Sequence, residues 1–437
     1  MADPLLDDLV DWLRIPSIST GGGLAADLRR AAEWVCERVD AAGGDAHLLE
    51  GAGNPIAYGE LASGRPGAPT VLIYGHYDVQ GPGPLEAWTT PPFEPDVRDG
   101  RIYARGASDD KGNFLPLLHV ACELARRGEL PVDVRVVVEG EEEVGGGVLA
   151  QWIARDERGA DCAVVWDSTM ADERTPAITT ALRGLVFAEV TVRTGRRDLH
   201  SGVYGGTVLS AAHVLHSMLA QVLPGPHGRV REELMAGVEP PATAERESWA
   251  RLPDGDAVIA AAGGRPVHPR AGAEFYERTG ALPALDVNRI ETGAARTIVP
   301  AEASASLSLR LAPRQRSEEM QPVLERLLRA AAPAGVMVEI STHRAEPALF
   351  DVDSPPMRLA AEALERACGR PPAFVRSGGS IPVVAQLAAR GIPVIVGGFA
   401  LDADEIHAPN ESYRLESLRL GEAAARELYP ALARLAR

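Results

Sequence analysis

The chain has 437 residues and a net charge of −17 at neutral pH. This length exceeds that of a typical single domain, so we expect two domains. Apolar residues make up 46% of the sequence and charged residues 24%, which is typical of a globular protein and excludes a disordered or collagen-like chain. The acidic balance argues against binding to nucleic acid or to an anionic membrane surface, because both attract basic proteins.

The cysteines and the N-terminus favour an intracellular location. The four cysteines are widely separated and lack the close spacing of a zinc ribbon, so we expect buried free thiols in a reducing compartment. The N-terminal segment is acidic and lacks the basic and apolar regions of a signal peptide. No stretch of about 20 apolar residues is present that could span a bilayer. We therefore expect a cytoplasmic protein.

The first part of the chain has the apolar spacing of helices. Leucines and Trp12 recur at intervals of three and four residues before Pro16, which predicts that a first helix ends there. A second pattern of this kind runs over residues 28–39 and is followed by Gly43 and Gly44, which are typical of the end of a helix. We therefore expect two helices before the first strand.

Short continuous apolar runs then predict strands that are buried on both faces of a sheet. The runs cover residues 70–74, 134–138, 162–166 and 393–396. Helical patterns cover residues 112–127 and 413–436. Because strands that alternate with helices favour parallel pairing, we expect an α/β domain with a mostly parallel sheet and helices on both faces.

A different pattern begins at about residue 181. Residues 185–192 and 305–311 alternate between apolar and polar side chains, which is typical of half-buried antiparallel strands. The α/β pattern returns near residue 347. We therefore expect an inserted α+β domain with an antiparallel sheet inside a discontinuous catalytic domain. The inserted domain would comprise residues 181–346, and the catalytic domain residues 1–180 and 347–437.

Titratable side chains follow the ends of the predicted strands. They are His76, Asp78, Glu139, Glu141, Glu142, Glu143, Asp167 and His407, and Asp109 lies in the loop before a predicted helix. Because the carboxyl ends of parallel strands meet at one sheet edge, we expect these side chains to lie close together. Taken singly, each has a structural interpretation: a packed histidine, a solvated acidic turn or a helix cap. Together, the carboxylates would repel one another unless cations compensated them. Mixed histidine and carboxylate ligands suit zinc, manganese or cobalt, and two divalent ions would compensate the charge.

Five motifs occur in an order that is known from one protein family. They lie at residues 75–80, 105–112, 139–145, 199–206 and 378–382. With these motifs the whole chain resembles the di-zinc metallopeptidase family of carnosine dipeptidases, aminoacylases, glutamate carboxypeptidases and succinyl-diaminopimelate desuccinylases. It is most similar to the carnosinase-like dipeptidases. The resemblance implies hydrolysis of the amide bond of dipeptides or small peptide-like substrates by a water that bridges two metal ions, most often zinc.

The resemblance also implies roles for the residues at the sheet edge. One metal ion would bind His76 and Asp167, and the other Glu143 and His407. Asp109 would bridge the two ions. Glu142 would act as the general base that activates the water. The triple glutamate at 141–143 leaves the register open, and anchoring it on Gly145 selects Glu142 as base and Glu143 as ligand. Asp78 matches the carboxylate that orients the imidazole of His76.

The inserted domain resembles the lid and dimerisation domain of the family. His200 matches the lid histidine that reaches the partner's site in dimeric members, which implies a homodimer, although a surface histidine is the plain structural alternative. Arg310 matches the residue that binds the substrate carboxylate, and a structural salt bridge is its alternative. Thr297, Gly379 and Ser380 match neighbouring substrate contacts.

The substrate is less defined than the chemistry. Aspartate at position 167 favours peptide cleavage, because deacylase members more often carry glutamate there. An N-acyl or N-carbamoyl amino acid deacylase, or an amide hydrolase of specialised metabolism, remains the first alternative. A non-catalytic binding protein on the same fold is the second, although no predicted ligand is missing. A serine hydrolase is disfavoured because the sequence has no Gly-x-Ser-x-Gly motif. Gly81 replaces a proline that is usual in carnosinases, and residues 222–285 give no prediction.

Overall fold

The computed structural model describes residues 3–379 and 381–435. The chain divides into two compact units. The first unit contains the residues up to 180, residues 350–374 and those from 383 onward. The second contains residues 181–349 and 375–382. The short segment 375–382 therefore belongs with the second unit, although its sequence pattern does not separate it from the C-terminal part of the chain.

A nine-stranded sheet has the order β1-β2-β6-β3-β7-β17-β8-β15, in which β16 also pairs with β8. Its strands from β1 to β17 in this order belong to the first unit, β15 belongs to the second, and β8 and β16 have residues in both. Its centre is parallel and consists of the four predicted strands: β6 (Asp133–Glu139), β3 (Thr70–His76), β7 (Cys162–Trp166) and β17 (Val394–Gly398). Antiparallel pairing joins the flanking strands β1 (Asp45–Leu49), β2 (Ile56–Leu61), β8 (Ala177–Leu182) and β15 (Ala348–Leu349) to their neighbours, and β16 (Ala373–Ser377) pairs with β8. The predicted α/β class is confirmed.

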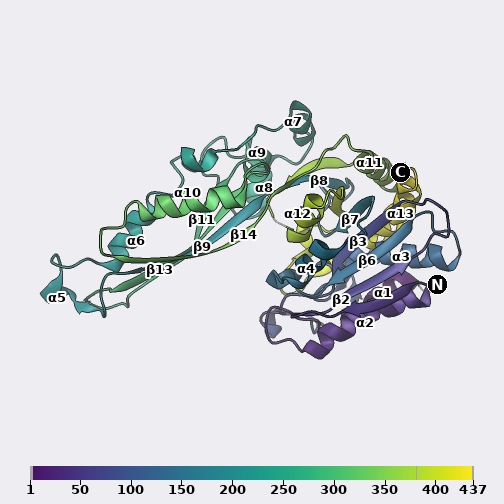
Figure 1. The fold of residues 1–437 in the computed structure, drawn as a ribbon, viewed down its shortest axis with the longest axis horizontal. Helices are drawn as coiled ribbons and strands as arrows, with labels where there is room; N and C mark the ends of the chain where they lie inside the picture. The colour runs from purple at the N-terminus through teal and green to yellow at the C-terminus, as the bar shows by residue number, and fades with distance from the viewer. Residues whose placement is uncertain (1–2, 380, 436–437) are drawn as a thin grey trace. The chain divides into compact units, whose positions relative to one another are not determined.

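Helices cover both faces of this sheet (Figure 1). They are α1 (Pro4–Leu13), α2 (Ala25–Ala41), α3 (Lys111–Arg126), α4 (Val148–Arg155), α11 (Pro355–Cys368), α12 (Pro382–Ala389) and α13 (Leu415–Leu432). Figure 1 shows α4 and α12 on the other side of the sheet from α1 and α2. Trp12 of α1 stacks on Trp34 of α2 with ring centroids 5.0 Å apart. In β3, Val71 and Ile73 join the core beneath these helices, and Leu72 is equally buried on the opposite face, as expected for a strand in the middle of three layers.

A small three-stranded sheet joins two loops that are far apart in the sequence. It contains β4 (Asp96–Arg98), β5 (Arg101–Tyr103) and β18 (Ser412–Arg414), in the order β18-β5-β4. The register continues beyond β5, where the Ala104 N–H donates to the carbonyl oxygen of Glu411. This pairing brings the loop before α3 next to the loop before α13. The predicted residues Asp109 and His407 lie on these two loops.

The second unit contains a four-stranded antiparallel sheet in the order β11-β13-β9-β14. The strands are β11 (Ala284–Thr292), β13 (Glu302–Leu311), β9 (Gly184–Arg193) and β14 (Met337–Ala345). Alternate residues such as Val186 and Leu309 face a core formed with α6 (Ala211–Leu219) and α10 (Ser317–Arg329). The two predicted alternating segments are therefore strands with one buried face, and the other face of this sheet is open (Figure 1).

Short elements complete the second unit. Figure 1 shows α5 (Ser201–Tyr204) at one end of the sheet and α7 (Thr243–Trp249), α8 (Gly255–Ala261) and α9 (Phe275–Gly280) at the other. The last three fall within residues 222–285, for which the sequence predicts no definite structure. Among the helices of residues 3–379 and 381–435, none combines the length and the hydropathy that crossing a bilayer requires. All four cysteines are unpaired.

Candidate metal centre

Five side chains at the carboxyl edge of the sheet form two groups that share one residue. His76, Asp109 and Asp167 form the first group, and Asp109, Glu143 and His407 form the second. Within each group, one candidate ligand atom of every residue lies within 4.8 Å of those of the others. The sequence predicts the same five residues with the same partition. The structure brings these residues together, and metal binding by them stays a prediction.

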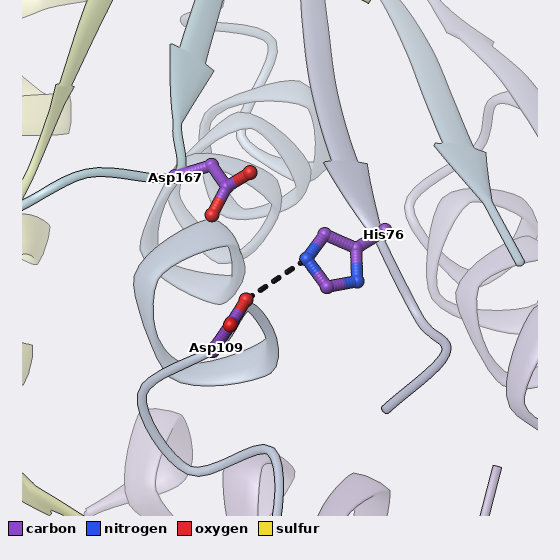
Figure 2. A group of neighbouring side chains, drawn as sticks. All are labelled: His76, Asp109 and Asp167. Atoms are coloured by element: carbon purple, nitrogen blue, oxygen red, sulfur yellow. Dashed lines mark hydrogen bonds and ion pairs between the residues drawn. The ribbon is translucent and has the colours of Figure 1, made fainter. Parts of the chain in front are cut away.

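His76 ends strand β3 and is fully buried. Its Nδ1 lies 3.0 Å from the backbone carbonyl oxygen of Asp78, and its Nε2 lies 3.0 Å from Oδ1 of Asp109. Because a carbonyl oxygen can only accept, Nδ1 carries a proton and Nε2 is the atom that faces the group. Figure 2 shows His76, Asp109 and Asp167 pointing toward one another from the ends of two strands and the loop before α3.

Asp109 lies between the two groups. While its Oδ1 faces His76, its Oδ2 lies 2.8 Å from Nε2 of His407. The same imidazole nitrogen of His407 is 3.3 Å from Oε2 of Glu143, which also accepts a hydrogen bond of 2.8 Å from the side chain of Gln80. One carboxylate oxygen thus faces each group, which is the geometry expected of a residue that bridges two ions.

Glu411 holds the loop that carries Asp109. Its carboxylate is fully buried and accepts backbone hydrogen bonds from Gly106, Ser108 and Asp109 at 3.0–3.2 Å. It also pairs with the buried guanidinium of Arg105 at 2.7 Å. The sequence did not identify this role, because a glutamate four residues after His407 carries no signal of its own. The small sheet formed by β5 and β18 is what brings it under the loop.

Asp78 contacts both His76 and the turn that carries Glu142, and its role in orienting the imidazole of His76 stays a prediction. Its carboxylate lies 3.5 Å from Nδ1 of His76, farther away than its own backbone carbonyl oxygen. The carboxylate accepts hydrogen bonds from the N–H groups of Glu142 and Glu143 at 3.3 and 3.2 Å. It also accepts a hydrogen bond of 2.6 Å from the hydroxyl of Ser19, a contact that no sequence motif indicated. Asp78 therefore holds the backbone of the turn that carries the predicted base.

The electrostatics of the group match a cation site. Burial, followed by the charge of Asp109, raises the pKa of Asp167 well above its usual value. In the described part of the chain, no ion pair joins an arginine or a lysine to the five residues. Oε1 of Glu143 is buried without a hydrogen-bond partner. Crowded carboxylates and an unsatisfied oxygen are costly unless a cation compensates them. This set of oxygen and imidazole donors fits two divalent ions.

We expect protonation of the group to compete with cation binding. Hydrogen bonds with Asp109 and Glu143 raise the pKa of His407 to about 10. Burial would raise the pKa of Asp109, but hydrogen bonds with His407 and His76 lower it below the usual value. Burial also raises the pKa of Glu142 to about 7, and Asp109 and Glu143 add to this effect. A metal ion must displace the imidazolium protons, so we expect binding to release protons.

The predicted substrate residues lie in the second unit. His200 is exposed on β10 (Leu199–His200), and its Nδ1 accepts a hydrogen bond of 3.0 Å from the N–H of Gly202. Thr297 lies beside it, because β10 pairs with β12 (Ile298–Val299) and the N–H of Ser201 donates to the Thr297 carbonyl oxygen. Gly379 donates its N–H to the hydroxyl of Ser377. Ser380 falls outside the described residues.

Arg310 has a neighbour that the sequence did not reveal. Arg310 pairs with Leu185 across β13 and β9, and Arg183 lies directly before β9, close enough for its charge to interact with that of Arg310. Nε of Arg183 donates to the carbonyl oxygen of Gly378 at 3.3 Å. Burial, and then the charge of Arg310, lowers the pKa of Arg183 to about 10. The pairing register creates this neighbourhood, and register cannot be read from separate strands.

Histidines and carboxylates that gather at the edge of a parallel sheet are the donor set expected of a metal-dependent hydrolase. Comparison with known proteins is consistent with this class. Residues 72–429 match the model of peptidase family M20/M25/M40. The chain belongs to this family and is therefore a metallopeptidase.

Relatives are similar over nearly the whole chain. A cysteinylglycine-S-conjugate dipeptidase from Corynebacterium striatum is 30% identical over 420 residues, which covers 90% of this chain and 88% of the relative. The human Beta-Ala-His dipeptidase is 26% identical over 374 residues, which covers 82% of this chain and 73% of that protein. Among solved structures, an M20-family metallo-carboxypeptidase from Sulfolobus solfataricus has a TM-score of 0.89 and 28% identity and covers 99% of this chain and 100% of its own.

Proposed function

We propose that this metallopeptidase hydrolyses the amide bond of dipeptides or small peptide-like substrates and uses two divalent metal ions, zinc in the first place and manganese or cobalt as alternatives. The observation that carries the proposal is the position of Asp109, which faces both groups of candidate ligands while Glu142 lies on the neighbouring turn. The names of the relatives from Corynebacterium striatum and human support dipeptides as substrates.

The proposed roles follow from the chemistry of each side chain. Two bound divalent ions would polarise the amide carbonyl and make a water molecule more acidic. His76 and Asp167 would hold one ion, Glu143 and His407 the other, and Asp109 both. Glu142 accepts the proton of the attacking water on its carboxylate and returns it to the leaving amine. Its raised pKa of about 7 suits a group that must both take and release a proton near neutral pH.

The second unit supplies the proposed substrate contacts. The guanidinium of Arg310 binds the free carboxylate of the substrate, with contacts from Thr297, Gly379 and Ser380 nearby. In the proposed homodimer, which assembles through this unit, His200 of one protomer stabilises the oxyanion in the site of its partner. The family resemblance supports this arrangement.

Light scattering tests whether the protein is a dimer in solution. Mixed dimers of His200→Ala and Glu142→Ala should regain measurable turnover, because one of their two sites is complete.

A second candidate function is the removal of C-terminal residues from longer peptides. The solved metallo-carboxypeptidase with 28% identity and a TM-score of 0.89 favours it. Both functions need a substrate with a free C-terminal carboxylate, so Arg310 would have the same role. Peptides of two to five residues separate them: a dipeptidase loses activity with length, whereas a carboxypeptidase does not. N-acetyl and N-carbamoyl amino acids in the same panel test the deacylase alternative.

The first experiment is metal analysis combined with hydrolysis of this panel, on one preparation, with and without added zinc or manganese. We expect about two metal ions per chain, as in other two-metal sites, and dipeptide cleavage that a chelator abolishes and added metal restores. If the protein binds two metal ions but cleaves no peptide, the proposed substrates are wrong and the proposed metal site still stands. If no metal binds under any loading condition, the proposed metal site is wrong.

A cytoplasmic location is proposed as well, and the unpaired cysteines support it.

A further inference from the structure

The turn at residues 140–146 carries Glu142 and Glu143, and its third glutamate points elsewhere. Oε1 of Glu141 accepts a hydrogen bond of 3.0 Å from the backbone N–H of Asn54. The side chain of Asn54 returns a hydrogen bond of 2.7 Å to the carbonyl oxygen of Gly140. Glu141 is half-buried and belongs to neither group of candidate ligands. It therefore joins this turn to the loop before β2.

Two glycines leave room for the Glu141 carboxylate. A Cβ atom on Gly53 would lie 1.8 Å from Oε1 of Glu141, and one on Gly146 would lie 2.1 Å from Oε2. Both distances are far below van der Waals contact, so any side chain at either position would displace the carboxylate. Backbone therefore borders the carboxylate on two sides, one belonging to the loop and the other to the turn itself.

The backbone of Glu141 also closes the turn. Its carbonyl oxygen accepts hydrogen bonds from the N–H groups of Val144 at 3.3 Å and Gly146 at 2.9 Å. The short helix η2 (Glu142–Val144) lies within this closure. Glu142 and Glu143 are thus held from two directions: the Asp78 carboxylate binds their N–H groups, and the residue before them is fixed to the loop at 53–54.

We propose that Glu141 is a positioning residue of the metal centre: its carboxylate, seated between Gly53 and Gly146, sets the orientation of the turn that presents the base Glu142 and the ligand Glu143. The proposal rests on the proposed function. Glu141 acts through its neighbours and touches neither a metal ion nor the substrate. A displaced supporting group of a metal centre typically costs roughly 10- to 100-fold in metal affinity or activity.

The test compares Glu141→Ala with Glu141→Gln in the metal-loaded full chain. The alanine variant removes the anchor and is expected to lose roughly 10- to 100-fold in kcat, with weaker zinc binding in a chelator competition assay and little change in KM. The glutamine variant keeps an acceptor oxygen of the same shape and is expected to retain most of both. The exposed Glu37, replaced by alanine, is the matched control and should leave all three quantities unchanged.

Two outcomes overturn the proposal. If Glu141→Ala keeps wild-type kcat and zinc affinity, the anchor has no effect on the site, whatever happens to Tm. If Glu141→Gln loses as much kcat and zinc affinity as Glu141→Ala, the negative charge of Glu141 is what matters. Glu141 would then act directly on the metal centre and not as an anchor of the turn. Zinc affinity is measured without any substrate. The proposal therefore remains testable even if the wild-type protein cleaves no peptide, which would contradict only the proposed function.

A second variant leaves Glu141 unchanged and alters the space between Gly53 and Gly146 that its carboxylate occupies. Gly53→Ala forces the carboxylate to move and is expected to lower kcat and zinc affinity in the same direction. In the double variant with Glu141→Ala, the added loss from Gly53→Ala should disappear, because the group it displaces is already absent. If the losses of kcat and zinc affinity in the two single variants add fully in the double variant, Gly53 acts independently of Glu141. The proposed role of Gly53 in placing the Glu141 carboxylate would then be wrong.

Discussion

Two clusters of histidine and carboxylate side chains in the first unit have similar composition and opposite electrostatics. One is the group around Asp109. The other consists of His119, Glu123 and Glu422, whose candidate ligand atoms also lie within 4.8 Å of one another. In this second cluster Arg426 pairs with Glu123 and with Glu422 at 2.5 and 2.7 Å.

The two clusters therefore differ in how their negative charge is compensated. The hydrogen bond from Arg426 lowers the pKa of Glu123, so the protein itself supplies the cation. In the part of the chain that the structure describes, no arginine or lysine forms an ion pair with the five candidate ligands around Asp109, and burial strongly raises the pKa of Asp167. Missing counter-charge, more than residue type, therefore distinguishes the candidate metal site from the salt-bridge network between α3 and α13.

The largest expected effect comes from Asp109, compared with Glu123. Asp109→Asn replaces the carboxylate shared by both groups with a neutral amide, so we expect zinc binding to be lost or strongly weakened at both and turnover to fall to background. Glu123→Gln should leave zinc content and turnover unchanged. Metal analysis by mass spectrometry and a dipeptide assay measure both. Full zinc content in Asp109→Asn would refute its bridging role.

The second effect concerns Glu142, which is not a predicted ligand. Glu142→Ala should keep its metal ions and lose about 10²- to 10⁴-fold in kcat, the usual contribution of a general base. Near-normal turnover of the metal-loaded variant would exclude Glu142 as the base. Loss of metal together with activity would instead place Glu142 among the ligands and shift the register of the triple glutamate.

A smaller effect is expected at the arginines of the second unit. Hydrogen bonds to charged groups contribute about 1.5–3 kcal/mol, so Arg310→Met should raise KM by roughly 10- to 100-fold for a dipeptide with a free carboxylate. For the corresponding dipeptide amide the change should be small. Arg183→Met tests its neighbour and should have a weaker effect of the same kind. An equal loss on acid and amide substrates would show that Arg310 does not bind the carboxylate.

The smallest expected effect concerns the pH dependence of stability and comes from Glu139, a buried carboxyl group outside both clusters. Burial raises the pKa of Glu139 from 4.5 to about 8, and the hydroxyl of Tyr74 donates to it. The folded protein thus holds this proton more tightly than the unfolded chain. Its stabilising contribution is complete below about pH 4.5 and is lost as the pH rises through 8.

Replacing Glu139 by glutamine removes this dependence. In metal-free protein, the Tm of Glu139→Gln relative to wild type should rise between pH 5 and pH 9, both measured by calorimetry. Glu37→Gln, a change at an exposed position, is the control. A constant difference across this range would show that Glu139 titrates at the same pH in the folded and unfolded states.

The sequence predicted the parts of the fold that depend on local pattern. Continuous apolar runs marked the four central strands, including β3 and β17, since both faces of these strands are buried. Alternation marked β9 and β13, since helices cover only one face of their sheet. The same strand ends, together with the family motifs, led to the five residues that the structure brings together at the sheet edge. The short helices within residues 222–285 were not predicted, and neither were elements such as α10 and β14.

What the sequence did not reveal depends on tertiary geometry. The carbonyl of Asp78, and not its carboxylate, is the nearer partner of His76, and a choice between two groups of one residue cannot be read from spacing. Tertiary packing and strand register bring segments that are far apart in the sequence together, and this places Ser19, Glu411 and Arg183 beside their partners. Glu141 was left ambiguous beside Glu142 because three successive glutamates look alike until the loop at residues 53–54 is in place.

The central claim is that the group around Asp109, and not the cluster around Glu123, holds two divalent ions. Anomalous X-ray diffraction at the zinc absorption edge, on crystals grown with zinc, tests it directly. We predict two anomalous peaks, one on each side of the Asp109 carboxylate, at about 2.0–2.2 Å from its oxygens, and no peak at His119. A single peak away from Asp109, or a peak between His119 and Glu422, would contradict it.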